Sequence, residues 1–210
     1  MGRTRIKICG LRDEAAVEAA VVGGADAVGF VLVESSPRFI EPEDAGALMM
    51  VLPPMVMTVG VVVNLSVDEF CETEQRFPAH LMQLHGSENP KTVAACGPGI
   101  LKGIRFAPET IKTDLARWDA VDEVDAILID GSSGGEGVAF DWGLLGEHVE
   151  SVSKPIILAG GLTPDNVGRA IAQVQPFAVD VSSGVESQPG VKDLGAIAAF
   201  CQAVRQADAG

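Results

Sequence analysis

The feature that most constrains this chain is a regular alternation between short apolar runs and longer helix-like segments. Strand-like runs rich in β-branched residues lie at residues 5–9, 26–32, 57–63, 80–84, 100–105, 125–130, 155–159 and 177–182. Each is followed by a helix-like pattern, at residues 13–23, 42–52, 66–76, 88–96, 110–119, 141–150, 164–174 and 193–206. Glycine, proline, aspartate and serine residues separate the two kinds of segment. This alternation is typical of parallel β/α units.

Eight such units in 210 residues, with no long linker, favour a (β/α)8 TIM barrel that forms a single domain over residues 1–210. A doubly wound open sheet is the alternative, but it rarely carries eight equally spaced strands without an extra segment. Ser66, Asp141 and Thr163, the last followed by a proline, provide start signals for three of the expected helices. We expect the tail from about residue 206 to be frayed.

Charge and hydropathy exclude several classes of partner. The chain holds 15 Lys and Arg against 29 Asp and Glu, a formal net charge of −14. Such a surface repels phosphate polymers, so we expect neither nucleic acid nor a membrane as a partner. No apolar run approaches the roughly 18 residues of a membrane span, and basic residues interrupt the start of the chain. We therefore expect a cytoplasmic protein with a packed core.

The cysteine pattern points away from metal and disulfide chemistry. The four cysteines are widely spaced, at Cys9, Cys71, Cys96 and Cys201. They form no C-x-x-C pair, and no histidine stands at metal-ligand spacing from them. The sequence predicts neither a zinc site nor a disulfide framework.

In a TIM barrel, the working face is the C-terminal end of the strands, where the βα loops converge. The polar and small residues expected at those ends are Cys9, Ser36, Arg38, Asn64, Gln83, His85, Arg105, Asp130, Gly160, Gly161, Asp180, Ser182, Ser183 and Gly184. These residues are the candidates for a functional site.

Cys9 ends the first expected strand, directly before Gly10. Because strand side chains alternate, Lys7 and Cys9 share one face, while Ile6 and Ile8 share the other. A cation beside a thiol lowers the thiol pKa from about 8.5 and favours the thiolate that a base or nucleophile needs. The alternative is that Cys9 is a small buried hydrophobic residue, as free cysteines often are.

Two turns of small residues follow the last two expected strands, at residues 159–164 and 180–186. In TIM barrels these two loops commonly form a phosphate site, because backbone N–H groups can approach an anion where side chains are absent. Gly160, Gly161 and Gly184 would allow that approach, and Ser182 and Ser183 could add hydroxyl donors. The alternative is that both are plain turns.

The chain resembles the phosphoribosylanthranilate isomerases of tryptophan biosynthesis along its whole length. The motifs that carry the resemblance are Lys7-Ile8-Cys9-Gly10-Leu11, Gly29-Phe30 with Ser36-Pro37-Arg38, Gly60-Val61 with Val63-Asn64, Gln83-Leu84-His85-Gly86, Asp130 with Gly134-Gly135, Phe140-Asp141-Trp142, Leu158-Ala159-Gly160-Gly161-Leu162, Asp180-Val181-Ser182-Ser183-Gly184-Val185-Glu186, and Pro189-Gly190 with Lys192-Asp193. Each motif is short, but their order and spacing together are specific.

The resemblance implies an Amadori rearrangement of N-(5'-phosphoribosyl)anthranilate, with no metal and no organic cofactor. It implies Cys9 as the general base and Asp130 as the general acid, which must be held protonated by burial or by nearby anions. Arg38 is implied as the ligand of the anthranilate carboxylate, since a guanidinium can grip a carboxylate through two parallel hydrogen bonds. The expected partner is a phosphorylated small molecule, and the chain is expected to be a monomer or a homodimer.

Other candidate residues at the strand ends are expected to support the site. Gln83 and His85 would line the pocket or fix a loop, and Asp180 would pair with Lys7 inside the barrel. Glu136 departs from the family pattern, which usually has a small hydroxyl residue there, and its charge would oppose an anionic substrate unless it points to solvent.

Two other functions remain open at this point. One is a degenerate barrel that binds a phosphorylated ligand without turnover. The unusual residues Glu136 and Val138 favour this alternative. The other is the sugar isomerase of the histidine pathway, which carries an aspartate where Cys9 stands and shows half-barrel repeats. Neither of those two features occurs in this chain.

Overall fold

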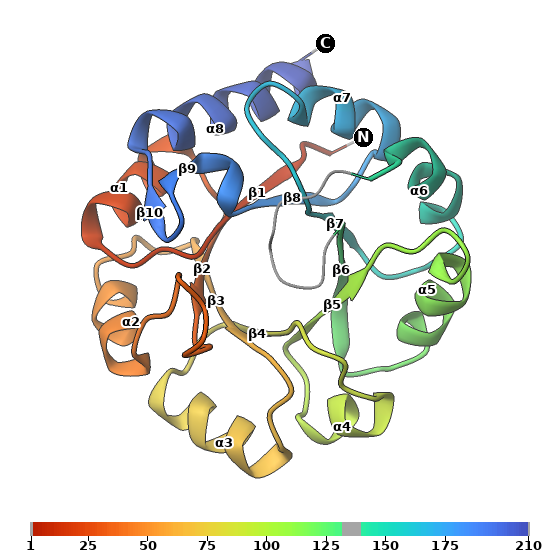
Figure 1. The fold of residues 1–210 in the computed structure, drawn as a ribbon, viewed down its shortest axis with the longest axis horizontal. Helices are drawn as coiled ribbons and strands as arrows, with labels where there is room; N and C mark the ends of the chain where they lie inside the picture. Colours follow the sequence, from red (N-terminus) through yellow and green to blue (C-terminus); the bar gives the residue numbers. More distant parts are fainter. Residues whose placement is uncertain (1, 132–139, 210) are drawn as a thin grey trace.

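The protein, in a computed structural model, is described for residues 2–131 and 140–209, and its parallel strands close into a barrel in the order β1 to β8 (Figure 1). The strands are β1 (Arg5–Cys9), β2 (Ala27–Val31), β3 (Met57–Val62), β4 (Leu81–Leu84), β5 (Ile100–Arg105), β6 (Val124–Asp130), β7 (Ile156–Leu158) and β8 (Ala178–Val181). Pairing of β1 with both β2 and β8 closes the ring.

Helices surround the barrel and cover the outside of its wall (Figure 1). They are α1 (Glu14–Gly23), α2 (Pro42–Met49), α3 (Val67–Arg76), α4 (Pro90–Ala95), α5 (Ile111–Asp119), α6 (Trp142–Val149), α7 (Val167–Val174) and α8 (Leu194–Ala209). The expected (β/α)8 barrel is therefore confirmed, and the doubly wound sheet is excluded.

Local capping explains where several helices begin. Ser66 caps α3 in a capping box with Glu69, and the Asp141 side chain accepts from the Leu144 N–H at the start of α6, as the sequence predicted. The start expected at Thr163 is wrong. The Thr163 carbonyl accepts from the Asn166 and Val167 N–H groups at 3.2 and 3.1 Å, so a separate turn follows Thr163 and α7 begins at Val167.

The frayed tail is also not found. Helix α8 continues to Ala209, and Asp208 accepts hydrogen bonds from the Thr4 N–H at 2.8 Å and from the Thr4 hydroxyl at 2.7 Å. These bonds fasten the end of the chain to its beginning. Within the described residues, no helix is long and apolar enough to cross a membrane.

Two apolar clusters follow from the alternation of side chains along the strands. The larger lies between the strands and the helices, and contains Ile6 and Ile8. The smaller fills the barrel interior with Val59, Leu101, Ala126, Leu128, Ile157, Ala159 and Ala178. Lys7, Cys9 and Asp180 share the inward face, so the interior becomes polar towards the C-terminal ends of the strands.

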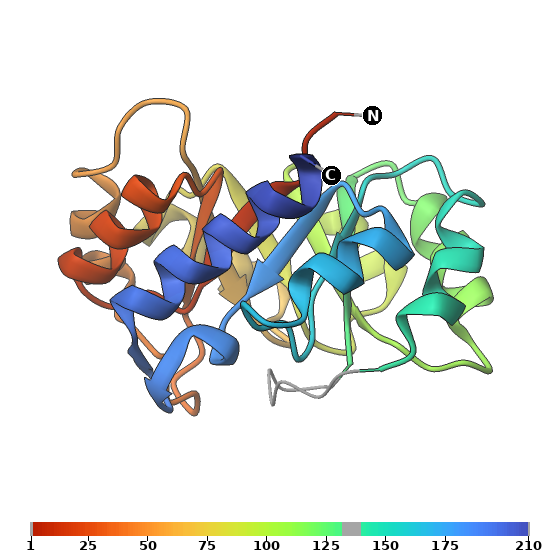
Figure 2. The ribbon, with the colours of Figure 1, turned by 90° about the horizontal axis from the view of Figure 1, so that it is seen from above.

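A hairpin after β8 was not predicted from the sequence. A short 3-10 turn, η1 (Ser183–Val185), leads into β9 (Glu186–Gln188), which pairs antiparallel with β10 (Val191–Lys192). Figure 2 shows this hairpin at one end of the barrel and both chain termini at the other end. The hairpin therefore lies at the C-terminal ends of the barrel strands, here called the barrel mouth, next to the loop that follows β2.

Candidate active site

The barrel mouth brings together side chains from the ends of several strands. Cys9 is the last residue of β1 and Asp130 the last residue of β6, and both are buried. His85 directly follows β4, and Arg38 lies on the loop between β2 and α2. Their convergence at one end follows from the parallel topology, which puts every strand end on the same face.

Cys9 lies in a tight, charged surrounding. A Cβ placed on Gly29 of the neighbouring strand would lie 2.7 Å from the Cys9 Sγ, so the glycine leaves space for the thiol. Two residues earlier on β1, Lys7 Nζ lies 2.8 Å from Asp180 Oδ1 on β8. This confirms the expected pairing of Lys7 and Asp180 inside the barrel.

Burial decides the direction of the Cys9 pKa. Loss of hydration raises the pKa of the thiol, the Lys7 charge opposes the rise, and the Asp180 charge adds to it, so that the net shift is upward. For Lys7, burial lowers the pKa, but the charges of Asp180 and of the Cys9 thiolate raise it to about 12. Lys7 lowers the pKa of Cys9 as expected, but desolvation outweighs the cation, so the net lowering predicted from the sequence is not found.

His85 faces Asp130 across the mouth. His85 Nε2 lies 3.5 Å from Asp130 Oδ2, and Gln83 Nε2 lies 2.9 Å from His85 Nδ1. With the Gln83 amide donating, His85 Nδ1 is an acceptor and the ring proton sits on Nε2, towards the Asp130 carboxyl. Gly103 on β5 lies directly against the imidazole and leaves space for it. The His85 ring thus lies between the Gln83 amide and the Asp130 carboxyl.

The two small-residue turns meet in one place. They line a cavity of about 30 Å³, whose walls are Asp130, Ala159, Gly160, Gly161, Leu162, Asp180, Val181, Ser182, Ser183 and Gly184. Gly160 and Gly161 have φ values of 83° and 65°, a left-handed region that favours glycine. A Cβ on Gly160 would lie 2.9 Å from Asp130 Oδ1, so the turn packs against the carboxyl. All five residues expected to hold a phosphate are therefore together.

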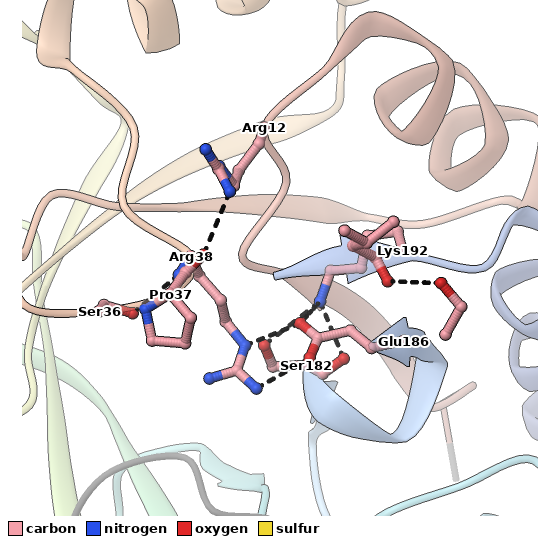
Figure 3. A network of polar contacts seen from close by, with 9 residues as sticks. Arg12, Ser36, Pro37, Arg38, Ser182, Glu186 and Lys192 are labelled. Carbon is pink, nitrogen blue, oxygen red and sulfur yellow. Dashed lines mark hydrogen bonds and ion pairs between the residues drawn. The ribbon is translucent and has the colours of Figure 1, made fainter. Parts of the chain in front are cut away.

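Arg38 has a partner that sequence reasoning did not assign. Its Nε donates to Glu186 Oε1 at 2.7 Å and its Nη2 donates to Glu186 Oε2 at 2.9 Å (Figure 3). Lys192 Nζ donates to the same Glu186 Oε1 at 2.8 Å, and to the Ser182 carbonyl at 2.8 Å. Both new residues lie on the hairpin, and their alternating charges just after the serine turn were the signal available in the sequence.

A second buried ion pair lies behind His85. Lys102 Nζ lies 2.7 Å from Glu88 Oε2 and also donates to the carbonyls of Leu84 at 3.0 Å and Gly86 at 2.8 Å. Those carbonyls flank His85 in the chain. A lysine within the apolar run of β5 was the signal that could have found this pair.

Two further expectations concern a metal site and the position of Glu136. Among residues 2–131 and 140–209, no group of three or more His, Cys, Asp or Glu could hold a metal ion. Glu136, with its expected effect on an anionic substrate, and Val138 lie outside the described residues.

Known proteins are similar in sequence to this chain along nearly its whole length. The family model described as N-(5'phosphoribosyl)anthranilate (PRA) isomerase matches residues 6–203. The N-(5'-phosphoribosyl)anthranilate isomerase of Pseudomonas putida strain GB-1 is 44% identical over 212 residues, covering 99% of this chain and 100% of that protein.

Solved structures agree with the sequence comparison. A phosphoribosyl anthranilate isomerase in complex with reduced 1-(o-carboxyphenylamino)-1-deoxyribulose 5-phosphate has a TM-score of 0.84 and 36% identity, covering 97% of this chain and 99% of the other. A structure of monomers generated from the dimeric enzyme of Thermotoga maritima has a TM-score of 0.83 and 35% identity, with the same coverage. This chain belongs to the N-(5'-phosphoribosyl)anthranilate isomerase family.

Proposed function

We propose that this enzyme converts N-(5'-phosphoribosyl)anthranilate into 1-(2-carboxyphenylamino)-1-deoxyribulose 5-phosphate, an aldose-to-ketose isomerisation in L-tryptophan biosynthesis. The observation that carries the proposal is the order of the strands around the mouth. The ring runs β6-β7-β8-β1, so the glycine turns after β7 and β8 lie between Asp130 and Cys9. A ribose held by its phosphate at those turns would lie within reach of a carboxyl on one side and a thiol on the other.

The first step opens the ribose ring. Asp130, in its protonated form, donates a proton to the ring oxygen while the bond from C1' to that oxygen breaks. The anthranilate nitrogen supplies an electron pair to C1', which gives a protonated Schiff base and leaves Asp130 as a carboxylate. His85 lies beside the carboxyl, with its Nε2 3.5 Å from Asp130 Oδ2, and would stabilise the charge left after proton transfer.

The second step moves hydrogen between two carbons. The Cys9 thiolate takes the proton from C2', the electron pair of that bond forms the double bond between C1' and C2', and the π pair of the C1'–N double bond returns to nitrogen, which gives an enolamine. The enolamine then loses its hydroxyl proton and gains a proton at C1', which gives the ketone. Burial favours the neutral thiol in the free enzyme. The positive Schiff base formed in the first step would favour the thiolate, because a nearby opposite charge stabilises the ionised form.

Substrate binding would use the remaining residues of the mouth. Gly160, Gly161, Ser182, Ser183 and Gly184 would hold the phosphate through backbone N–H and hydroxyl groups. Arg38 would hold the anthranilate carboxylate with the part of the guanidinium that Glu186 leaves open. Lys7 and Asp180 would neutralise each other's charge in the barrel interior, next to the site.

Two finer expectations belong to the same proposal. The partner would be a phosphorylated small molecule, as the related complex with reduced 1-(o-carboxyphenylamino)-1-deoxyribulose 5-phosphate supports. Location in the cytoplasm, and the choice between monomer and homodimer, stay predictions.

The test is a turnover assay of the purified protein that follows the loss of anthranilate fluorescence as substrate is consumed. We expect catalysis, with binding of the reduced product measured in parallel by calorimetry. Binding of the reduced product without turnover would favour the degenerate barrel. Turnover of the histidine-pathway aminoaldose at a comparable kcat/KM would favour the second sugar isomerase.

A further inference from the structure

The hairpin after β8 holds the Arg38 side chain from one side. Two of the three guanidinium nitrogens, Nε and Nη2, are bonded to the two oxygens of Glu186 at 2.7 and 2.9 Å. The side chains of Arg38 and Glu186 are 12% and 4% exposed. Figure 3 shows Nη1, the third nitrogen, directed away from Glu186. A guanidinium has five N–H donors, so the edge with Nη1 keeps donors for a second carboxylate.

Lys192 connects this pair to the serine turn. Its Nζ donates to Glu186 Oε1 at 2.8 Å, to the Ser182 carbonyl at 2.8 Å and to the Ser182 Oγ at 3.3 Å (Figure 3). Arg38, Glu186 and Lys192 together carry one net positive charge, which suits one incoming carboxylate. Burial opposes the charge of Glu186, but bonds from Arg38 and Lys192 hold its pKa below the ordinary value.

The backbone of the Arg38 loop is fixed by the same hairpin. Gly190, at the hairpin tip, lies so close to the Pro37 carbonyl that a Cβ would collide with it. Arg12 donates to that carbonyl at 3.2 Å, and the Arg38 N–H donates to Ser36 Oγ at 3.1 Å. The hairpin therefore constrains both the start of the Arg38 side chain and its end.

We propose that Glu186 and Lys192 are positioning residues that orient Arg38 for the substrate carboxylate and set its place relative to the phosphate turn. The proposal rests on the proposed function and extends it to two residues outside the catalytic pair. In this arrangement, the open guanidinium edge is oriented before the substrate arrives, so less rotamer freedom is lost on binding. The link from Lys192 to Ser182 ties the carboxylate end of the site to the phosphate end.

Glu186→Gln tests the first half of the proposal. The amide keeps the shape but puts an N–H donor against the guanidinium, so Arg38 loses its fixed orientation. We expect KM for the substrate to rise about tenfold while kcat changes less than twofold, because the lost contact is made equally in the ground and transition states. Affinity for inorganic phosphate should stay within twofold. Glu186→Asp, which keeps the charge, should recover part of the affinity, and Glu18→Gln on the exposed face of α1 is the matched control.

A double-mutant cycle tests whether Glu186 acts through Arg38. Glu186→Gln should change affinity for the reduced product about tenfold in the wild-type background and less than twofold in the Arg38→Met background. Equal effects in both backgrounds would overturn the proposal, as would an equal loss of phosphate affinity in a folded protein. Circular dichroism checks folding of each variant.

Lys192→Met tests the link to the serine turn. We expect weaker binding of both the reduced product and inorganic phosphate, each by about threefold or more, since Ser182 loses its donor. Unchanged phosphate affinity would overturn the link. All of these binding measurements use calorimetry, so they decide the proposal even if the wild-type protein shows no turnover, an outcome that would refute the proposed function alone.

Discussion

The two sides of the barrel mouth each contain a buried lysine–glutamate pair, but the pairs are used differently. On the side of β8, β1 and β2, Glu186 is bonded both to Lys192 and to the side chain of Arg38. On the side of β4 and β5, Lys102 and Glu88 are bonded to backbone groups around His85. The first pair orients a charged side chain, whereas the second fixes a stretch of main chain.

The faces of the strands explain this difference. Leu101 belongs to the interior cluster, so Lys102 points to the outside of the wall, where its Nζ lies 5.3 Å from the Trp118 ring centroid of α5. Lys192 lies on the hairpin at the barrel mouth, where its Nζ contacts the Ser182 carbonyl and Glu186 directly. Lys102 therefore contacts the backbone on either side of His85, at the carbonyls of Leu84 and Gly86.

The largest effect is expected at the thiol on the β1 side. Cys9→Ser should leave the fold intact and lower kcat by about 10²- to 10⁴-fold, because an alcohol is a far poorer base than a thiol. Steady-state kinetics measure the change, with the exposed Cys71→Ser as the control. Near-normal turnover in Cys9→Ser would show that another residue is the general base.

A similar loss is expected at the carboxyl on the opposite catalytic strand. Asp130→Asn should lower kcat by about 10²- to 10⁴-fold while phosphate affinity persists, because the amide cannot donate the ring-opening proton. Calorimetry with inorganic phosphate accompanies the kinetics, and the exposed Asp122→Asn is the control. If Asp130→Asn keeps more than a tenth of the wild-type kcat, the acid lies elsewhere.

The sequence predicted these strand ends well, and the reason is local. Period-two alternation placed Lys7 and Cys9 on the inner face, and parallel topology then brought Asp180 beside Lys7. Those two rules need only neighbouring residues and the order of strands. The positions of Cys9 and Asp130 at the mouth followed from the same rules.

What could not be predicted depends on contacts between distant parts of the chain. Arg38 and Glu186 are separated by 148 positions, and no local pattern shows that their side chains meet. The direction of the Cys9 pKa depends on the balance between burial and the Lys7 charge, and burial is set by the packing of the folded chain.

The buried pair on the β4–β5 side should matter most for stability. Lys102→Met leaves Glu88 buried without its cation, so we expect a loss of about 3–5 kcal/mol in the free energy of unfolding. Urea denaturation measures it, with the exposed Lys91→Met as the control and Lys102→Met with Glu88→Gln as the variant that removes both charges. A loss below about 1 kcal/mol would show that the pair does not hold this side together.

Arg38 should show the opposite behaviour, with an effect on binding and little on stability. Arg38→Met should raise KM by about 10- to 100-fold, in line with the loss of charge-assisted hydrogen bonds to a carboxylate. Affinity for inorganic phosphate should be unchanged, and the exposed Arg76→Met is the control. A loss of phosphate binding with normal affinity for the anthranilate end would reverse the proposed orientation of the substrate.

The smallest effect is on the dependence of stability on pH, and it concerns the buried thiol on the β1 side. The pKa of Cys9 is raised in the folded protein, so above the ordinary thiol pKa of about 8.5 the unfolded chain binds fewer protons than the folded one. Stability contributed by the neutral thiol is therefore present at neutral pH and lost as the pH rises, by at most about 1.4 kcal/mol per pH unit. Between pH 8 and 10, Cys9→Ser should lose less unfolding free energy than the wild type. Cys96 and Cys201, whose pKa values burial raises to about 11, contribute equally in both proteins, so the difference isolates Cys9. Parallel stability profiles for the two proteins would show that burial does not hold this thiol neutral.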